Sequence, residues 1–249
     1  MRLILDFGNT LKKIAFYNGN TITDLLTCDK ITLSQLKSII NEHQAIDAAI
    51  LSTVTSYPLS IKNYLKEQFR FIEMDESTPV PVKVLYKTPD TLGKDRLAAV
   101  VACNHLFLGK DVLVINAGTC ITYDFVNAGS EYPGGAISPG MKMRFSALHN
   151  FTDKLPLVNN YIKTELTGND TESSIISGVM NGIIAEIDGV IDKYKLKNPE
   201  LLTVLSGGDA KYFDKSLKNS IFAVPNIVVE GLHIILNHNV DKENQTLPA

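Results

Sequence analysis

The chain has 249 residues, is 45% hydrophobic and 20% charged, and carries a formal net charge of −3 at pH 7. These values are typical of a globular protein with one large domain or two of ordinary size. Lys and Arg residues are scattered without a basic stripe, which argues against a nucleic-acid partner. The longest apolar run, residues 97–108, contains Asn104 and His105 and is too short to span a bilayer, so we expect no membrane residence.

The first half of the chain opens with a hairpin pattern. A buried strand is predicted at residues 2–6, a turn at 7–10, an alternating segment at 11–17 and a second turn at 18–20. Further along, we predict amphipathic helices at 31–43 and 61–69, strands at 45–52 and 69–73, and a buried helix at 97–108 that begins at the Asp95–Arg96 pair. Alternating strands and helices indicate an α/β fold.

The hairpin pattern returns at residue 112. A strand at 112–115, a tight turn at 116–119, alternation at 121–126 and a turn at 127–129 repeat the order of the first copy. Later elements are a long helix at 173–194, a strand at 201–205, a helix that opens at 209–213, a terminal helix at 229–236 and a polar tail at 241–249 that we expect to fray. The repeat predicts an internal duplication with domains at 1–110 and 111–249, although glycine hairpins are common and could recur by coincidence.

The first turn carries groups suited to phosphate binding. Asp6 ends the strand, and Gly8 lets the backbone approach a ligand that a Cβ would hold away. Asn9 and Thr10, with Lys12 and Lys13 nearby, offer donors to phosphate oxygens. The structural alternative is that this segment is only a favourable turn.

The second turn, with Gly118 and Thr119, strengthens the phosphate interpretation. Two such turns facing one another resemble the phosphate-binding loops of the actin, hexokinase and Hsp70 superfamily. Residues 206–208, Ser-Gly-Gly after a strand, resemble the glycine pair on the adenosine side in that superfamily. No GxxxxGK[ST] segment occurs, so the chain has no Walker A loop. The expected fold is therefore α/β, with two ribonuclease H-like (actin-like) domains and an ATP cleft between them.

A third group of candidate residues is the GKDR segment at 93–96, preceded by Tyr86. Asp95 could accept a proton from a substrate hydroxyl while Arg96 holds an anionic or polar group. The alternative is that Asp95 merely caps a helix. Residues 132–140 form an unusually glycine-rich loop, which suggests close approach to a ligand or to another subunit.

Seven motifs together carry a family resemblance. They are DFGNT (6–10), GKDR (93–96), AGT (117–119), GGAISPG (134–140), TDKLP (152–156), TESSIISG (171–178) and SGG (206–208). In order and spacing the chain is similar to the type III pantothenate kinases, from residue 3 to about residue 232. The resemblance implies ATP-dependent phosphorylation of pantothenate to 4′-phosphopantothenate, the entry step to coenzyme A.

The resemblance also implies roles for individual residues. Those expected to bind ATP are Asp6, Phe7, Gly8, Asn9, Thr10, Leu11, Lys12, Lys13, Thr119, Gly207 and Gly208. Those expected to bind pantothenate are Tyr86, Gly93, Lys94, Asp95, Arg96 and Thr171. Asp95 is the expected general base, and Asp6 is expected to help place Mg²⁺ through waters. A homodimer is implied, with the substrate pocket near the subunit interface.

One position departs from the family pattern. Where the family usually has an aspartate associated with a bound monovalent cation, this sequence has Asn116. Its carbonyl oxygen could still contact K⁺ or NH₄⁺, but it lacks the charge that offsets the desolvation of the ion. We therefore expect weaker dependence on a monovalent cation than in relatives.

Other interpretations remain open at this stage. The chain could be a kinase of the same superfamily for another small alcohol, or a kinase-dead regulatory or ligand-binding relative. An Hsp70-like ATPase module is a third alternative, and the lack of a peptide-binding extension argues against it. Three distant cysteines, Cys28, Cys103 and Cys120, match no zinc spacing and fit a reducing compartment. Asp6 comes too early for a signal-peptide core. We expect a cytoplasmic protein.

Overall fold

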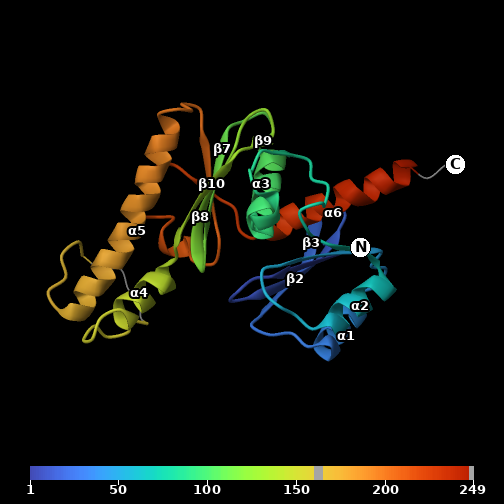
Figure 1. Ribbon diagram of the computed structural model, residues 1–249, viewed down its shortest axis with the longest axis horizontal. Coiled ribbons are helices and arrows are strands. Elements are labelled where there is room, and N and C mark those ends of the chain that lie inside the picture. The colour runs from blue at the N-terminus through green and yellow to red at the C-terminus, as the bar shows by residue number, and fades with distance from the viewer. Residues whose placement is uncertain (160–164, 247–249) are drawn as a thin grey trace. The chain divides into compact units, whose positions relative to one another are not determined.

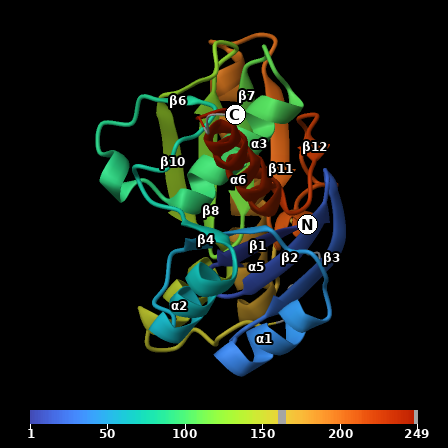
Figure 2. The same ribbon diagram turned by 90° about the vertical axis from the view of Figure 1, so that its right-hand side faces the viewer.

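The computed structural model describes residues 1–159 and 165–246. Internal contacts divide the chain into two compact units. The first consists of Met1–Leu108, Ser130–Pro133 and Asn226–Ala249, and the second of Gly109–Gly129 and Gly134–Pro225. Each unit is built on one five-stranded sheet (Figures 1 and 2).

The sheet of the first unit has the strand order β3-β2-β1-β4-β5. Its strands are β1 (Arg2–Phe7), β2 (Lys12–Asn18), β3 (Thr21–Cys28), β4 (Ala48–Thr53) and β5 (Arg70–Glu73). The central strand β1 pairs antiparallel with β2 and parallel with β4. Leu3, Ile4 and Leu5 are fully buried, because helices cover both faces of the sheet. This is why β1 is a continuous apolar run in the sequence.

Four helices complete the first unit. They are α1 (Leu33–Asn41), α2 (Leu59–Gln68), α3 (Lys94–Leu106) and α6 (Ile227–Thr246). The apolar side chains of α1 and α2 pack with those of β1, β2 and β4 in one core, whereas α3 and α6 pack against each other and against β4. Two smaller elements are the pair β6 (Lys83–Val84) and β9 (Glu131–Tyr132) and the 3₁₀ turn η1 (Pro89–Thr91).

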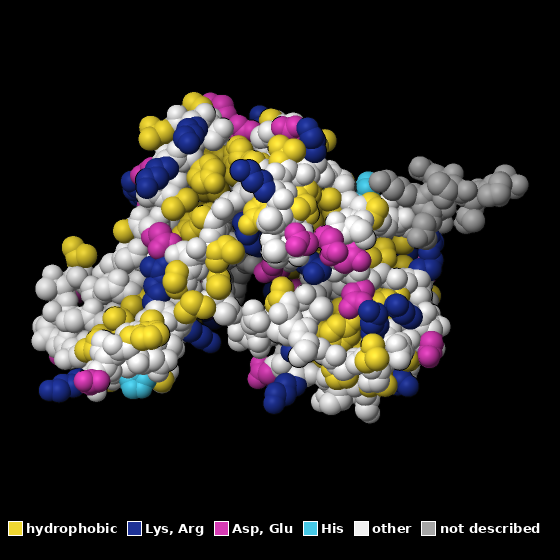
Figure 3. Space-filling view, in the orientation of Figure 1, with side chains coloured by type: hydrophobic (Ala, Val, Ile, Leu, Met, Phe, Trp, Pro, Cys, Tyr) yellow, Lys and Arg dark blue, Asp and Glu magenta, His cyan; other side chains and the backbone are white. Residues whose placement is uncertain are grey.

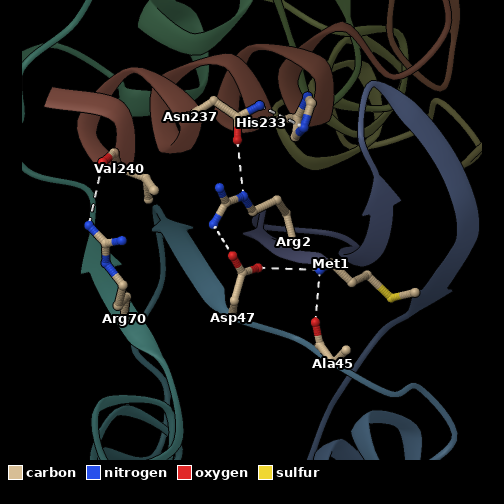
Figure 4. Close-up of polar contacts among 8 residues, drawn as sticks. All are labelled: Met1, Arg2, Ala45, Asp47, Arg70, His233, Asn237 and Val240. Carbon is tan, nitrogen blue, oxygen red and sulfur yellow. Dashed lines mark hydrogen bonds and ion pairs between the residues drawn. The ribbon is translucent and has the colours of Figure 1, made fainter. Parts of the chain in front are cut away.

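Helix α6 is held against the first unit by close packing and by polar contacts. A Cβ at Gly231 would overlap the carbonyl oxygen of Ala98 on α3, so glycine permits the two helices to approach closely. Figure 4 shows that Arg2 donates hydrogen bonds to Asn237 of α6 at 3.1 Å and to Asp47 at 2.7 Å. The helix extends to Thr246, so residues 241–246 of the tail that the sequence predicted to fray are helical, and 247–249 lie outside the described residues.

The second unit repeats the sheet with the order β10-β8-β7-β11-β12. Its strands are β7 (Val112–Ala117), β8 (Cys120–Val126), β10 (Gly134–Pro139), β11 (Leu202–Ser206) and β12 (Phe222–Ala223). Its helices are α4 (Met141–Asn150), α5 (Thr171–Lys195) and the 3₁₀ turn η2 (Ala210–Tyr212). The helix that the sequence predicted to open at 209–213 is limited to η2 and the turn after it.

The two sheets match strand for strand, which supports the predicted duplication. In each, the first strand forms an antiparallel hairpin with the second and a parallel pair with the fourth. Asp6 lies opposite Lys13 and Ser52, and Asn116 lies opposite Thr122 and Ser206. Asp6 and Asn116 therefore occupy equivalent positions at the ends of the two central strands.

The contact division differs from the predicted domains 1–110 and 111–249 in two main segments, and the boundary between the units lies at 108–109. Residues 130–133 and 226–249 group with the first unit. The reasons are the parallel pairing of β9 with β6 and the packing of α6 on α3. Neither contact leaves a local sequence signal, because the partners are distant in the chain.

Within the described residues, α5 is long and apolar enough by composition to cross a membrane. Its buried residues Ile183, Ile187 and Ile191 instead pack in the core of the second unit with residues of β7 and β11. An apolar stripe at this spacing is typical of a core helix. On the face drawn in Figure 3, basic side chains of the described residues are interspersed with acidic ones and form no continuous stripe.

Candidate active site

Two carboxylates lie close together in the first unit. Asp6 is the second-last residue of β1, and Asp95 lies in the first turn of α3. The pKa of Asp6 is raised to about 6, mainly by burial; the ammonium of Lys13 lowers it and the charge of Asp95 adds to the rise. The fold thus brings Asp6, Lys13 and Asp95 together from β1, β2 and α3. A partly desolvated acid pair of this kind is typical of a functional site.

The raised pKa predicts that ionised Asp6 lowers the free energy of unfolding. Between its usual value of 3.8 and about 6 the folded chain binds a proton that the unfolded chain releases, so this group destabilises the fold as pH rises through that window. We expect Asp6→Asn to raise the free energy of unfolding by about 3 kcal/mol at pH 8. The gain should disappear near pH 4. Urea unfolding at both pH values measures this gain, and Asp29→Asn, a substitution of an exposed aspartate, is the control. Equal effects of the two substitutions at pH 8 would contradict the raised pKa of Asp6.

Local backbone geometry sets the orientation of Asp95. Gly93 caps α3, and a Cβ there would lie 2.7 Å from Oδ1 of Asp95. The same Oδ1 accepts a hydrogen bond from the backbone N–H of Arg96 at 2.9 Å. Glycine is therefore needed for the carboxylate to fold back over the helix start. Lys94, the first residue of α3, is half-buried.

Arg96 is packed against an aromatic pair. Its side chain is only 5% exposed, and its guanidinium carbon lies 5.8 Å from the centre of the Tyr86 ring. Tyr86 in turn stacks on the fully buried Tyr132 of β9, with ring centres 6.5 Å apart. Sequence reasoning noticed Tyr132 only as the start of a glycine-rich loop. Tyr132 pairs with Val84 in a parallel ladder between strands 48 residues apart in the sequence. A contact over this separation leaves no local sequence pattern, so the stacking of Tyr132 on Tyr86 could not be predicted.

The first predicted phosphate loop is a tight turn between β1 and β2. The N–H of Gly8 donates to the carbonyl oxygen of Leu11 at 3.1 Å, while Asn9, Thr10 and Leu11 are exposed at the tip. Phe7 is fully buried, so only its backbone is available to a ligand.

The two lysines that follow this turn point to different partners. Lys12 donates to the carbonyl oxygen of Asp29 at 3.3 Å and lies 5.8 Å from the ring centre of Phe7. Lys13 donates to the side chain of Asn226 at 2.9 Å. Sequence reasoning missed Asn226, although an Asn directly before an apolar helix is a common helix-start signal.

In the second unit, three backbone segments meet at residues 117–119. Gly207 has φ +100°, and a Cβ there would overlap the carbonyl oxygen of Ala117; a Cβ at Gly140 would overlap the carbonyl oxygens of Gly118 and Thr119. The N–H of Asp209 donates to Ala117 at 3.0 Å. These glycines let the turn at Thr119 and the Ser-Gly-Gly turn lie against each other, which leaves Thr119 and Gly208 exposed at the surface of the unit.

The glycine-rich segment at 132–140, which the sequence predicted as a loop, is mostly strand. Most of it is β10, paired antiparallel with β8. A Cβ at Gly135 would overlap the backbone of Tyr123 on β8, and Gly140 packs on the turn at Thr119. The density of glycine is thus explained by close approach within the chain itself.

Two further predicted site residues lie in the second unit. Asn116 is half-buried near the end of β7, and Thr171 is the exposed first residue of α5. Asp170 caps α5 and accepts a hydrogen bond from the N–H of Ser173 at 2.7 Å, which fixes where the helix starts. The ligand contacts assigned to both residues stay predictions.

Solved structures of other proteins share this fold. A candidate 2-dehydro-3-deoxygalactonokinase from Sinorhizobium meliloti matches 99% of this chain over 100% of its own, with a TM-score of 0.56 and 11% identity. A candidate Baf family transcriptional activator from Campylobacter jejuni matches 96% of this chain and 99% of its own, with a TM-score of 0.60 and 20% identity. The predicted fold class is confirmed: this is an α/β chain with two similar sheets and the actin-like fold.

Sequence comparison gives the family. The family model described as type III pantothenate kinase matches residues 2–193. A relative named type III pantothenate kinase from Christiangramia forsetii is 43% identical over 240 residues, which cover 96% of this chain and 99% of the relative. The chain belongs to the type III pantothenate kinase family.

Proposed function

We propose that this chain transfers the γ-phosphoryl group of ATP to the terminal hydroxyl of pantothenate and forms 4′-phosphopantothenate, the first step of coenzyme A biosynthesis. Membership of the family supports the reaction. The structural observation that carries it is the juxtaposition of Asp95 at the start of α3 with Asp6 and Lys13 at the first turn.

The first unit supplies the groups for the acceptor. Asp95 orients the attacking hydroxyl and accepts its proton, and this role suits a carboxylate in a partly desolvated site. The guanidinium of Arg96 pairs with the carboxylate of pantothenate, since it offers several donors and packs on Tyr86. Lys94 completes the proposed acceptor contacts of this unit, and Gly93 allows the turn that aims Asp95. The family resemblance also assigns an acceptor contact to Thr171, a residue of the second unit.

The groups proposed for ATP fall on both glycine turns. Thr119 and the backbone at Gly207 and Gly208 contact the nucleotide, and the first loop with Lys12 and Lys13 contacts its phosphates. Mg²⁺, when bound, neutralises phosphate charge, and Asp6 would hold it. The chemistry of Asp6 suits this ion, because proteins bind Mg²⁺ through one or two carboxylates together with substrate phosphates. With a pKa of about 6, the Asp6 carboxyl is mostly ionised at pH 7.

A coupled assay for ADP release from Mg-ATP tests the function. We expect release with pantothenate and not with a panel of sugars, and mass spectrometry of the product should give a phosphorylated pantothenate. Turnover with a sugar instead would favour a related kinase. Binding of pantothenate and ATP by calorimetry without ADP release would favour a regulatory protein.

The monovalent-cation site is a separate expectation for the same assay. Asn116 stands at the position equivalent to Asp6 and brings an amide oxygen but no charge. We therefore expect replacement of K⁺ by Na⁺ to change turnover by no more than about twofold, because an amide oxygen alone offsets little of the desolvation of K⁺. The variant Asn116→Asp should gain K⁺ dependence. A strict K⁺ requirement of the unaltered chain contradicts this expectation.

Quaternary state and location complete the proposal. A homodimer is proposed from the family resemblance, and the exposed apolar residues Ile137, Phe151 and Leu166 of the second unit (62%, 88% and 81% exposed) are candidates for its contact. Light scattering would measure the mass, and a monomer would refute this part. We also propose a cytoplasmic location, which cell fractionation checks.

A further inference from the structure

The ammonium of Lys13 is held by a residue near the other end of the chain. Lys13 lies on β2 directly opposite Asp6, and its Nζ donates a hydrogen bond to Oδ1 of Asn226 at 2.9 Å. An ammonium carries three N–H donors. The bond to Asn226 fixes the direction of one donor and leaves the others for Asp6 and for a phosphate.

Asn226 has a backbone conformation that few side chains adopt. Its φ is +57°, in the left-handed region where asparagine is among the best-tolerated residues other than glycine. Its carbonyl oxygen accepts the hydrogen bond from the N–H of Glu230 at 3.1 Å and so begins α6. The side chain is thereby directed at Lys13 from the very start of the helix.

The start of α6 is anchored to the same strand by further contacts. Glu230 accepts a hydrogen bond from the hydroxyl of Tyr17 on β2 at 2.9 Å, and His233 stacks on the Tyr17 ring with centres 3.9 Å apart. Gly231 packs on Ala98 of α3. Asn226 is therefore set on a rigid support that contacts both β2 and the helix that carries Asp95.

We propose that Asn226 is a positioning residue whose side-chain oxygen holds the Lys13 ammonium beside Asp6 in the orientation that binds the phosphates of ATP. The proposal rests on the proposed function, because it assigns Lys13 to the phosphates. It predicts that Asn226 acts on the nucleotide and not on pantothenate, and that it acts only through Lys13.

A double-mutant cycle tests this coupling. Asn226→Gly keeps the left-handed backbone and removes the amide, and we expect the KM for ATP to rise about tenfold, as for a lost hydrogen bond to a charged group. The value of kcat and the KM for pantothenate should stay within about twofold of the unaltered enzyme, because ground-state binding of the nucleotide alone is affected. Lys13→Met should raise the KM for ATP at least as much, and adding Asn226→Gly to it should have no further effect.

Two more variants separate positioning from general damage. Asn226→Asp keeps an acceptor oxygen and should restore the KM for ATP to within about threefold, since a carboxylate also accepts from an ammonium. Asn237→Ala removes another α6 asparagine that accepts from a cation, Arg2, and should leave the KM for ATP unchanged. An unchanged KM in Asn226→Gly, or effects of Asn226→Gly and Lys13→Met that multiply in the double variant, would overturn the proposal.

The failure of the function and the failure of this inference give different results. If the unaltered chain does not phosphorylate pantothenate, the function falls. The same cycle read by calorimetric binding of Mg-ATP without an acceptor still measures the coupling between Lys13 and Asn226. Independent effects on that binding constant would refute the positioning role.

Discussion

Asp95→Asn is expected to lower kcat with pantothenate by about 10²–10⁴-fold, the range for loss of a positioned general base. The amide has nearly the same size and still accepts a hydrogen bond from the N–H of Arg96, so the start of α3 should keep its shape. It cannot take the hydroxyl proton. The coupled ADP assay measures kcat, and calorimetry should show dissociation constants for ATP and pantothenate within about threefold of the unaltered enzyme.

The matched control for this substitution is Asp90→Asn. Asp90 is an exposed acid in η1 of the same unit, a few residues before α3. It should leave kcat unchanged. If Asp95→Asn turned over as fast as Asp90→Asn, the base would have to be another group, and the acid pair would lose its catalytic assignment.

Gly207→Ala is expected to lower the free energy of unfolding by about 2–5 kcal/mol, through overlap and backbone strain together. The Cβ of an alanine at this position would overlap the carbonyl oxygen of Ala117. The alanine would also have to adopt a φ near +100°. The turn at Thr119 is itself held by a hydrogen bond from the N–H of Gly118 to the carbonyl oxygen of Cys120 at 2.9 Å. The turn therefore cannot move away from the new Cβ without losing this hydrogen bond. Urea denaturation measures the loss, and ATP affinity should fall with it.

Gly208→Ala provides the comparison one residue away. No heavy atom lies within 4 Å of a Cβ built at Gly208, and its φ is not in the left-handed region. It should unfold with a free energy within about 0.5 kcal/mol of the unaltered chain, as for surface substitutions. Equal losses at both positions would show that the overlap at Ala117 is relieved by movement and does not constrain the turn.

The local features of the fold were predictable because they depend on nearby residues. The strand at 2–6, the second hairpin at 112 and the long helix at 173–194 all appear within a few residues of their expected bounds. Each is set by apolar periodicity or by a turn. The same reasoning placed Asp95 at a helix start, and this is where it lies.

The remaining features depend on contacts between distant segments. Glycines at 134–140 suggested a loop, but β10 pairs with β8, and strand pairing is decided by the partner. The contacts of Tyr132 with Tyr86 and of Asn226 with Lys13 join segments that are far apart in the chain. The raised pKa of Asp6 also required the fold, because it results mainly from burial.

The return of α6 to the first sheet has a consequence for biosynthesis. Ribosomes release a chain from its N-terminus, so β1, β2 and β4 emerge long before the helix that covers one of their faces. Most of the second unit lies in residues 134–225, which are made before α6. Because domains fold as their segments become available, the unit encoded second should reach its native core first, while the earlier sheet keeps apolar surface exposed to chaperones until α6 arrives.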